Sequence, residues 1–270
     1  GERTELSLAS ESSLVPREDR HRFRLMAQYW PRWEGHLEKE GLSRADVLRL
    51  IKRWITQENS PAVPEWAGKW DLPGIYVADS TNPELIKALP AQSVDLIISD
   101  PPWEEAGFEA GVWEALGQIA RRTLKPGRLL LAYTGKMFLP EVLHILGQHL
   151  DYLWMFGIFQ PDSNDRLRKF QFYSAWRPVL IFANPGERRW MTWLPDSAQS
   201  TRDKTWHDWG QDWRPATKWI DAFTLPGEII LDPFAGGGAF MYAAQQQGRT
   251  WLGFEKDEQT AAIAAGRMNG

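Results

Sequence analysis

The sequence predicts a doubly wound α/β fold with a mostly parallel sheet, preceded by a small helical appendage. Short segments rich in β-branched and aromatic residues alternate with segments of helical character over most of the chain. Many of the β-rich segments are apolar throughout, which is typical of strands that are covered on both faces. Strands and helices that alternate in this way indicate parallel βαβ units.

Composition narrows the class of protein. A chain of 270 residues with 43% hydrophobic side chains is long enough for one large α/β domain and a small second unit. The absence of cysteine excludes a disulfide-stapled secreted module. No apolar run approaches the roughly 20 residues that span a bilayer, so a cytoplasmic protein without membrane contact is expected. With a net charge of −4, any contact with nucleic acid must come from local basic patches.

Four regions are expected along the chain: a polar, disordered tail (1–16), a helical appendage (17–57), a linker (58–73) and the main α/β domain (74–270). The appendage is predicted because apolar residues recur at helical spacing after Ser43, which is a suitable N-cap. The linker contains Pro61 and Pro64, which disfavour regular structure.

The main domain contains seven expected strands and five expected helices. The strands are 74–77, 94–98, 129–133, 153–159, 179–182, 228–231 and 250–254. The helices are 83–89, 111–124, 140–150, 216–223 and 239–247. Gly248 follows the last of these helices, as glycine commonly does at a helix end.

Four acidic residues come at or just after the ends of apolar strands: Asp79, Asp100, Asp232 and Glu255. The carboxyl ends of parallel strands share one edge of a sheet, and ligands of open α/β sheets bind outside that edge. A single Asp after a strand is also ordinary turn chemistry. Four together predict one crevice that gathers residues distant in the sequence.

Three consecutive glycines, Gly236, Gly237 and Gly238, join a strand to a helix. Glycine lets the backbone approach a ligand closely, and the helix N-terminus behind it offers free N–H groups. Glu255 ends the next strand, from which an acid reaches ribose hydroxyls. These features predict a nucleoside-containing cofactor. Because Met241 stands where a dinucleotide motif has its third glycine, an adenosyl ligand without a pyrophosphate is favoured over NAD.

The segment Asp100-Pro101-Pro102-Trp103 offers hydrogen-bond acceptors without donors. The prolines fix the backbone and remove two N–H groups, so the pocket suits a donor-rich guest. An exocyclic base amine is such a guest, since Asp100 and the Pro101 carbonyl can take its two hydrogens while Trp103 covers the ring. The structural alternative is a proline-stiffened loop with a core tryptophan.

With these motifs, residues 74–268 resemble the β class of S-adenosylmethionine-dependent DNA amino-methyltransferases, in which the catalytic motif precedes the glycine motif. The resemblance implies a Rossmann-like fold of the class I methyltransferase type and methyl transfer to adenine N6 or cytosine N4 of a flipped base. Adenine is favoured because the cytosine enzymes often carry Ser at the position of Asp100. Catalysis is assigned to Asp100, Pro101, Pro102 and Trp103, and no metal is expected.

The resemblance also implies the cofactor contacts. Asp79 would bind the adenine amino group, Glu255 the ribose, and the glycine turn the methionine part. The cofactor residues assigned in this way are Asp79, Ser80, Gln211, Asp232, Phe234, Gly236, Gly237, Gly238 and Glu255, with Trp213 as a further contact. Ala239 departs from the family pattern, which usually has threonine there.

The expected partner is double-stranded DNA. The loop 160–172 carries Arg166, Arg168 and Lys169 beside aromatic residues, and such groups contact phosphates and bases. A solvated loop is the alternative. Because no large recognition domain is visible, a homodimer is considered for holding the duplex.

Other functions stay open. Cytosine-N4 methylation of DNA and adenine-N6 methylation of RNA are the nearest alternatives. An NAD-dependent oxidoreductase would need a hydride-transfer site, for which the sequence offers no His or Tyr constellation. A catalytically silent partner subunit would not need the intact Asp100 motif. The setting implied is a bacterial or phage-infected cell, and the recognition sequence cannot be read from the chain.

Overall fold

The computed structural model describes residues 71–102, 105–160, 165–167, 171–187, 194–201 and 212–269. They form one eight-stranded sheet, in the order β1-β10-β9-β2-β3-β7-β4-β8, and a separate two-stranded hairpin, β5-β6. The expected tail, the expected appendage and most of the expected linker lie outside the described residues.

The strands are β1 (Gly74–Val77), β2 (Val94–Ser99), β3 (Leu124–Tyr133), β4 (Asp151–Phe159), β5 (Asp165–Leu167), β6 (Phe172–Ser174), β7 (Trp176–Ala183), β8 (Ser197–Gln199), β9 (Ile229–Asp232) and β10 (Thr250–Glu255). The helices are α4 (Pro83–Ala88), α5 (Glu105–Glu109), α6 (Val112–Thr123), α7 (Leu139–Gly147), α8 (Arg214–Phe223), α9 (Ala239–Gln246) and α10 (Glu258–Asn269). Each strand and helix predicted for the main domain is present, with ends shifted by a few residues.

The sheet is mostly parallel, and the prediction of its class is confirmed. Within it, β7 runs antiparallel to both of its neighbours, β3 and β4, while every other neighbouring pair is parallel. The sequence did not indicate this reversal, because an apolar strand reads the same in either direction.

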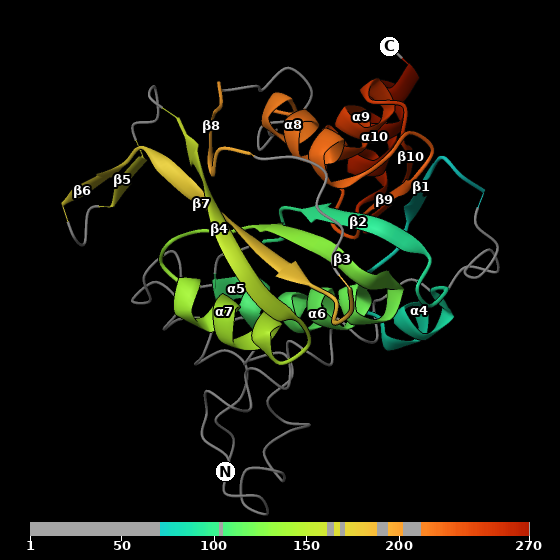
Figure 1. Cartoon of the computed structure of the whole chain (residues 1–270), viewed down its shortest axis with the longest axis horizontal. Coiled ribbons are helices and arrows are strands. Elements are labelled where there is room, and N and C mark those ends of the chain that lie inside the picture. Colours follow the sequence, from blue (N-terminus) through green and yellow to red (C-terminus); the bar gives the residue numbers. More distant parts are fainter. Residues whose placement is uncertain are drawn as a thin grey trace, which may run out of the picture. The chain divides into compact units, whose positions relative to one another are not determined.

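Helices cover both faces of the sheet (Figure 1). On one face α8, α9 and α10 pack against alternate strand residues such as Leu96 and Ile98. On the other face α4, α6 and α7 pack against the intervening strand residues, such as Ile97. Because side chains alternate along a strand, β2 must be apolar on both sides, and all six of its residues are buried.

The order of the strands reverses between β9 and β2. From β9 the chain moves outward to β10, and from β2 it moves outward in the opposite direction to β3. This reversal predicts a ligand site at the carboxyl ends of β9 and β2, the usual position of ligands in open α/β sheets.

The residue that breaks the dinucleotide motif, Met241, is accommodated by a glycine on the neighbouring strand. Met241 is fully buried in α9 and lies against Gly253 of β10. A Cβ atom at Gly253 would overlap Met241 Sδ and lie 3.1 Å from Ala235 Cβ. The helix and the strand therefore still approach closely, because the glycine that allows the contact is on β10 and not on α9.

Replacing Gly253 with alanine is expected to destabilise the domain by about 1–3 kcal/mol, because the added methyl group overpacks a site without spare room. Urea denaturation would measure the loss. The double variant Gly253→Ala/Met241→Ala should recover part of it, because the shorter side chain frees the space. A Gly253→Ala variant as stable as the parent would contradict the packing described.

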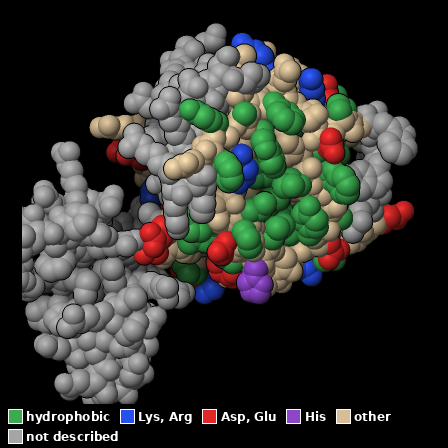
Figure 2. Space-filling view, turned by 90° about the vertical axis from the view of Figure 1, so that its left-hand side faces the viewer, with side chains coloured by type: hydrophobic (Ala, Val, Ile, Leu, Met, Phe, Trp, Pro, Cys, Tyr) green, Lys and Arg blue, Asp and Glu red, His purple; other side chains and the backbone are tan. Residues whose placement is uncertain are grey.

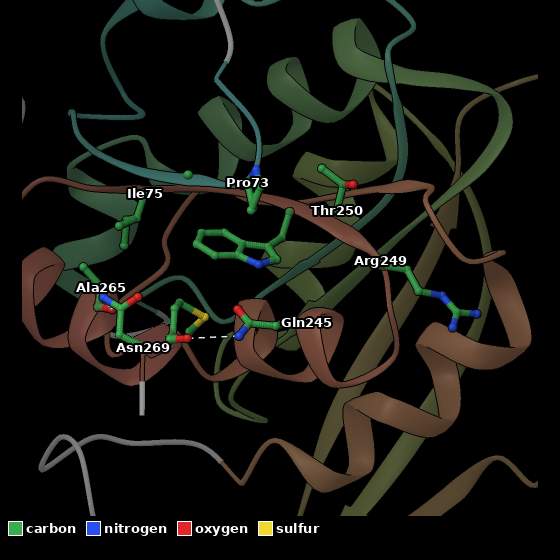
Figure 3. Close-up of a pocket in the computed structure, with 10 residues that line it drawn as sticks. Pro73, Ile75, Gln245, Arg249, Thr250, Ala265 and Asn269 are labelled. Atoms are coloured by element: carbon green, nitrogen blue, oxygen red, sulfur yellow. Dashed lines mark hydrogen bonds between the residues drawn. The ribbon is translucent and has the colours of Figure 1, made fainter.

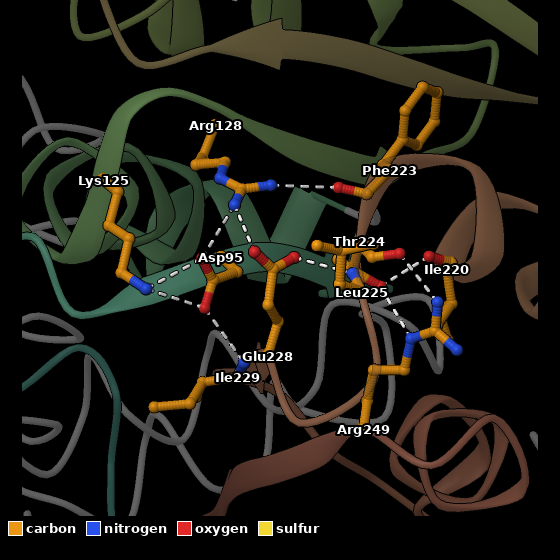
Figure 4. Close-up of polar contacts among 10 residues, drawn as sticks. All are labelled: Asp95, Lys125, Arg128, Ile220, Phe223, Thr224, Leu225, Glu228, Ile229 and Arg249. Carbon is orange, nitrogen blue, oxygen red and sulfur yellow. Dashed lines mark hydrogen bonds and ion pairs between the residues drawn. The ribbon is translucent and has the colours of Figure 1, made fainter. Parts of the chain in front are cut away.

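A polar network joins the amino ends of β2, β3 and β9 (Figure 4). Its centre is Asp95, which is 2% exposed. Its carboxylate accepts from Lys125 Nζ at 2.8 and 2.9 Å and from the backbone N–H of Ile229 at 3.1 Å, and it pairs with Arg128 Nη2 at 3.2 Å. Arg128 also pairs with Glu228. The buried acid thus has its charge compensated by two cations.

Arg249 extends the network towards α8. Its guanidinium donates to the carbonyl oxygen of Thr224 at 2.7 Å and to the hydroxyl of the same residue at 3.0 Å. Both contacts close the end of α8, whose last carbonyls have no partner within the helix. This network lies at the edge of the sheet opposite to the predicted crevice.

Candidate active site

The four acids predicted to share one edge follow adjacent strands of the sheet. Asp79 comes after β1, Glu255 ends β10, Asp232 ends β9 and Asp100 follows β2, which is the order of these strands in the sheet. The structure therefore brings together residues from the beginning, middle and end of the main domain.

The glycine turn and Glu255 are held together by backbone hydrogen bonds. Gly236 adopts a φ of +48° and Gly238 a φ of +73°, both in the left-handed region that favours glycine. The N–H of Gly236 donates to Glu255 Oε2 at 3.0 Å, and that of Asp257 donates to Oε1 at 2.9 Å. The carboxylate is thereby oriented along the turn. A Cβ atom built at Gly236 meets no atom within 4 Å, so the turn borders open space.

The segment after β1 is tied to the segment after β9. Asp79 Oδ1 accepts from the N–H of Thr81 at 2.9 Å and from its hydroxyl at 2.7 Å, while the hydroxyl of Ser80 donates to the carbonyl oxygen of Pro233 at 2.5 Å. Asp79 and Ser80 are buried. Hydrogen bonds therefore fix the orientations of both predicted cofactor residues, and Ser80 is tied to the segment that joins β9 to the glycine turn.

Asp232 is buried at the end of β9, between the strand that ends in Glu255 and the strand that Asp100 follows. Its Oδ1 accepts from the hydroxyl of Ser99 at 2.6 Å and from the N–H of Phe234 at 3.1 Å. The pKa of Asp232 is raised to about 7, mainly by burial; the two hydrogen bonds lower it and the charges of Asp100 and Glu255 raise it, with smaller effects that this value includes. This carboxyl group thus changes its protonation near neutral pH.

Replacing Asp232 with asparagine should alter how stability depends on pH. Between about pH 4 and pH 7 the folded protein holds a proton on Asp232 that the unfolded chain has released, so this residue's contribution to stability falls as pH rises. Asparagine keeps an acceptor oxygen but does not titrate. As pH rises through that range, the unfolding free energy of the variant should increase relative to that of the parent by up to about 1.4 kcal/mol per pH unit. Urea unfolding measured across the range would test this, and a difference independent of pH would contradict it.

Asp100 lies opposite an arginine that sequence reasoning missed. Arg177 Nη1 is 3.2 Å from Asp100 Oδ2, and the side chains are 20% and 15% exposed. Arg177 is the second residue of β7, and the antiparallel direction of β7 brings its beginning to this edge. No signal in the sequence identified it, because the direction of β7 could not be predicted.

Tyr133, the last residue of β3, is buried beside two other aromatic residues. Its ring packs 4.7 Å from that of Phe240 and 5.9 Å from that of Trp219, measured between centroids. In the part of the chain that the structure describes, its buried hydroxyl has no hydrogen-bond partner. Burial, followed by the charge of Asp100, raises the pKa of Tyr133 well above its usual value. Tyr133 is therefore an uncharged phenol at this edge.

Several predicted site residues cannot be placed. Trp103, Gln211, Arg168 and Lys169 lie outside the described residues, as does the side chain of Arg166. Of the two prolines after Asp100, Pro101 is buried and Pro102 is exposed, while Phe234 and Trp213 are half-buried.

The predicted loop 160–172 contains part of a hairpin. Its strands β5 and β6 pair antiparallel, with Arg166 opposite Tyr173. Phe172 and Tyr173 on β6 are both 67% exposed. This hairpin therefore presents aromatic rings to solvent, and the prediction of an irregular loop was wrong over its strands.

A cavity and a hydrophobic surface are further features of the described residues. A cavity of about 650 Å³ lies between the starts of β1 and β10 and the helices α9 and α10. Figure 3 shows the residues that line it, and none of the four acids is among them. Figure 2 shows hydrophobic side chains gathered on the side of the molecule where β5, β6 and α7 lie in Figure 1.

No helix within the described ranges is long and apolar enough to span a membrane.

The edge as a whole is rich in acceptors. Asp79, Glu255, Asp232 and Asp100 supply carboxyl groups, and Arg177 pairs with one of them. Such a surface suits a ligand with hydroxyl and amine donors or a positive charge, and it repels a pyrophosphate.

Comparisons with known proteins agree with this architecture. Residues 94–266 match the family described as DNA methylase, of the N6 and N4 methyltransferase type. The structure of the PvuII DNA methyltransferase, described as cytosine-N4-specific, has a TM-score of 0.63 and 18% identity, covering 74% of this chain and 88% of that one. The complex of M1.HpyAVI with SAM has a TM-score of 0.57 and 20% identity, covering 73% of this chain and 98% of that one.

Curated relatives match over shorter segments. The type II methyltransferase M.HindIII of Haemophilus influenzae is 41% identical over 49 residues, which are 18% of this chain and 16% of the relative. The alignments with the curated relatives cover less than a fifth of each relative's length. The solved structures share the fold, and the family match includes Asp100, Arg177, the glycine turn and Glu255.

Proposed function

Because this chain belongs to the DNA methylase family of N6 and N4 methyltransferases, we propose that it methylates an exocyclic base amine in DNA with S-adenosyl-L-methionine as the methyl donor. The observation that carries the proposal is the sheet edge, where the Asp100-Pro101-Pro102 segment, which offers only acceptors, lies two strands from Glu255. The residues assigned to the cofactor and those assigned to the amine therefore lie at the same edge of the sheet.

The residues of this edge fit the proposed cofactor. Its ribose hydroxyls and adenine amine are donors, and its sulfonium is positively charged, so the carboxyl groups are complementary to it. We assign Glu255 to the ribose, Asp79 to the adenine amine and the turn of Gly236 to Gly238 to the methionine part. When bound, S-adenosyl-L-methionine supplies an electrophilic methyl group. An NAD-dependent activity is disfavoured because a pyrophosphate would meet the same negative charges.

Asp100 and Pro101 would prepare the amine for attack. The lone pair of an exocyclic amine is delocalised into the base and is a weak nucleophile. Two hydrogen bonds, from one N–H to the Asp100 carboxylate and from the other to the Pro101 carbonyl, hold the nitrogen in place and localise its lone pair. Positioning and electrostatics then supply most of the rate enhancement. To reach this pocket the base must leave the duplex, at a cost of a few kcal/mol of unstacking.

We propose adenine N6 as the acceptor, on the ground that an aspartate stands at position 100. The DNA would approach from the side of the β5-β6 hairpin, where Phe172 and Tyr173 offer exposed rings for contact with bases. Arg166, Arg168 and Lys169 lie in the same segment of sequence and are assigned to phosphate contacts. A homodimer and a location in the bacterial cytoplasm, where the DNA lies, remain predictions of this proposal.

Mass spectrometry of nucleosides would test the proposal. The purified protein is incubated with S-adenosyl-L-methionine and either duplex DNA or RNA, and the digested products are analysed for N6-methyladenine and N4-methylcytosine. We expect N6-methyladenine in DNA. N4-methylcytosine would correct the base, a methylated nucleoside in RNA alone would correct the substrate, and unmodified products with a cofactor that does not bind would refute the function.

A further inference from the structure

Arg177 makes a charged contact that the proposed mechanism has not used. Its Nη1 atom lies 3.2 Å from Asp100 Oδ2, and both side chains are mostly buried. The register of β7 with β4 sets Arg177 opposite Ile158, which belongs to the core on the face of α8 and α9. Arg177 therefore faces the same side of the sheet as the glycine turn before α9.

Among the described residues, three groups on neighbouring strands interact with Asp100. The charge of Asp100 raises the pKa of Tyr133 of β3 and of Asp232 of β9, and Arg177 of β7 pairs with its carboxylate. Asp212, which precedes α8, is a further acid whose charge acts on Tyr133. Of these three groups, the guanidinium is the one that carries a positive charge. A partly buried carboxylate beside a second carboxyl group tends to take up a proton unless a cation compensates it.

We propose that Arg177 is the positioning residue of this site: it keeps Asp100 ionised and fixes the orientation of its carboxylate towards the amine. This inference rests on the proposed function. A protonated Asp100 would carry an O–H donor and lose acceptor capacity, so it could not hold the amine in the same way. The two prolines fix the backbone of the segment, and Arg177 fixes the side chain.

Kinetics as a function of pH would test this role. The kcat for methyl transfer to duplex DNA is measured for the parent, Arg177→Met and Arg177→Lys, each also in an Asp232→Asn background, because interacting acids titrate together. Removing the cation should move the acid limb of the profile upward by about 1–3 pH units, so that kcat falls up to tenfold per unit below the new limb. The acid limb should move less in Arg177→Lys than in Arg177→Met, since lysine keeps the positive charge but lacks the planar guanidinium.

A second measurement does not depend on activity. Titration of ¹³C-labelled aspartate carboxyl groups by NMR, with Asp100→Asn used to assign the signal, reports the protonation of Asp100 directly. Its midpoint should rise in Arg177→Lys and rise further in Arg177→Met. The affinity for S-adenosyl-L-methionine, measured by calorimetry, should stay unchanged, because the ion pair of Arg177 is with Asp100, on the amine side of the site.

The matched control is Arg128→Gln. Arg128 is an arginine of similar burial, 15% exposed, that pairs with carboxylates at the opposite edge of the sheet. Its replacement should lower stability without moving the acid limb.

Three outcomes would overturn the role of Arg177. The first is an acid limb or an Asp100 midpoint that stays in place in Arg177→Met. The second, if that variant does not fold, is the same result in Arg177→Lys. The third is an equal shift in Arg128→Gln. Absence of methyl transfer by the parent would refute the proposed function instead, and the NMR titration would still decide whether Arg177 sets the charge of Asp100.

Discussion

Asp100→Ala is expected to lower kcat for methyl transfer by about 10²–10³-fold, while binding of S-adenosyl-L-methionine stays largely intact. The variant lacks the acceptor that holds one amine hydrogen, and it removes the carboxylate of the ion pair with Arg177. Asp79, Glu255 and the glycine turn are unchanged, so the cofactor keeps its contacts. Single-turnover kinetics with a methylated-nucleoside readout, together with calorimetric titration of the cofactor, would measure both quantities.

Two further variants make the result interpretable. Asp100→Asn keeps the shape and one acceptor oxygen but lacks the charge, and it should fall between the parent and Asp100→Ala. Asp196→Ala removes an exposed aspartate that precedes β8, a strand separated from β2 by three others, and should turn over like the parent. Turnover retained in Asp100→Ala would remove the mechanism, whereas equal loss of turnover and cofactor affinity would indicate a disrupted fold.

Asp95→Ala is expected to destabilise the domain by about 2–4 kcal/mol, which is large against the stability of a typical domain. The change leaves the N–H of Ile229 without its acceptor and removes the charge that Arg128 and Lys125 share. Because Lys125 is 42% exposed, water replaces part of its interaction, and the loss is smaller than for a fully buried pair. The midpoint of urea denaturation would measure it.

The partner variant Lys125→Ala separates the contributions. Lys125 is partly solvated, so its removal should cost less than about 1 kcal/mol. The folded fraction of Asp95→Ala should keep its kcat, because Asp95 begins β2 and Asp100 follows its end. Two results would contradict this prediction: a loss of unfolding free energy below 1 kcal/mol in Asp95→Ala, or a fall in kcat per folded molecule. Either would mean that the network of Asp95 does not act on stability alone.

The sequence predicts well those parts of the fold that depend on burial. Strands such as β2 are apolar because helices cover both of their faces, and the pattern is visible without a structure. The four acids could be placed at one edge for the same reason, since a parallel sheet aligns the ends of its strands.

Other parts depend on long-range contacts that no local pattern encodes. Arg177 could not be identified because the direction of β7 is fixed by its pairing with β3 and β4. The short strands β5, β6 and β8 have three residues each, too few for a periodic signal, and the alanine-rich α10 has only a weak apolar stripe. The role of Asp95 depends in the same way on contacts with Lys125, Arg128 and Ile229, which lie far from it in the sequence.

The hydrogen bond from Ser99 to Asp232 crosses from β2 to β9, where the strand order reverses. Asp232 responds to the charges of Asp100 on one side and Glu255 on the other. A guest that alters the field at either acid therefore changes how readily Asp232 takes up a proton, and that change is felt at the other acid. Asp100 and Glu255 are in this way linked electrostatically through the buried carboxyl group that lies between their strands.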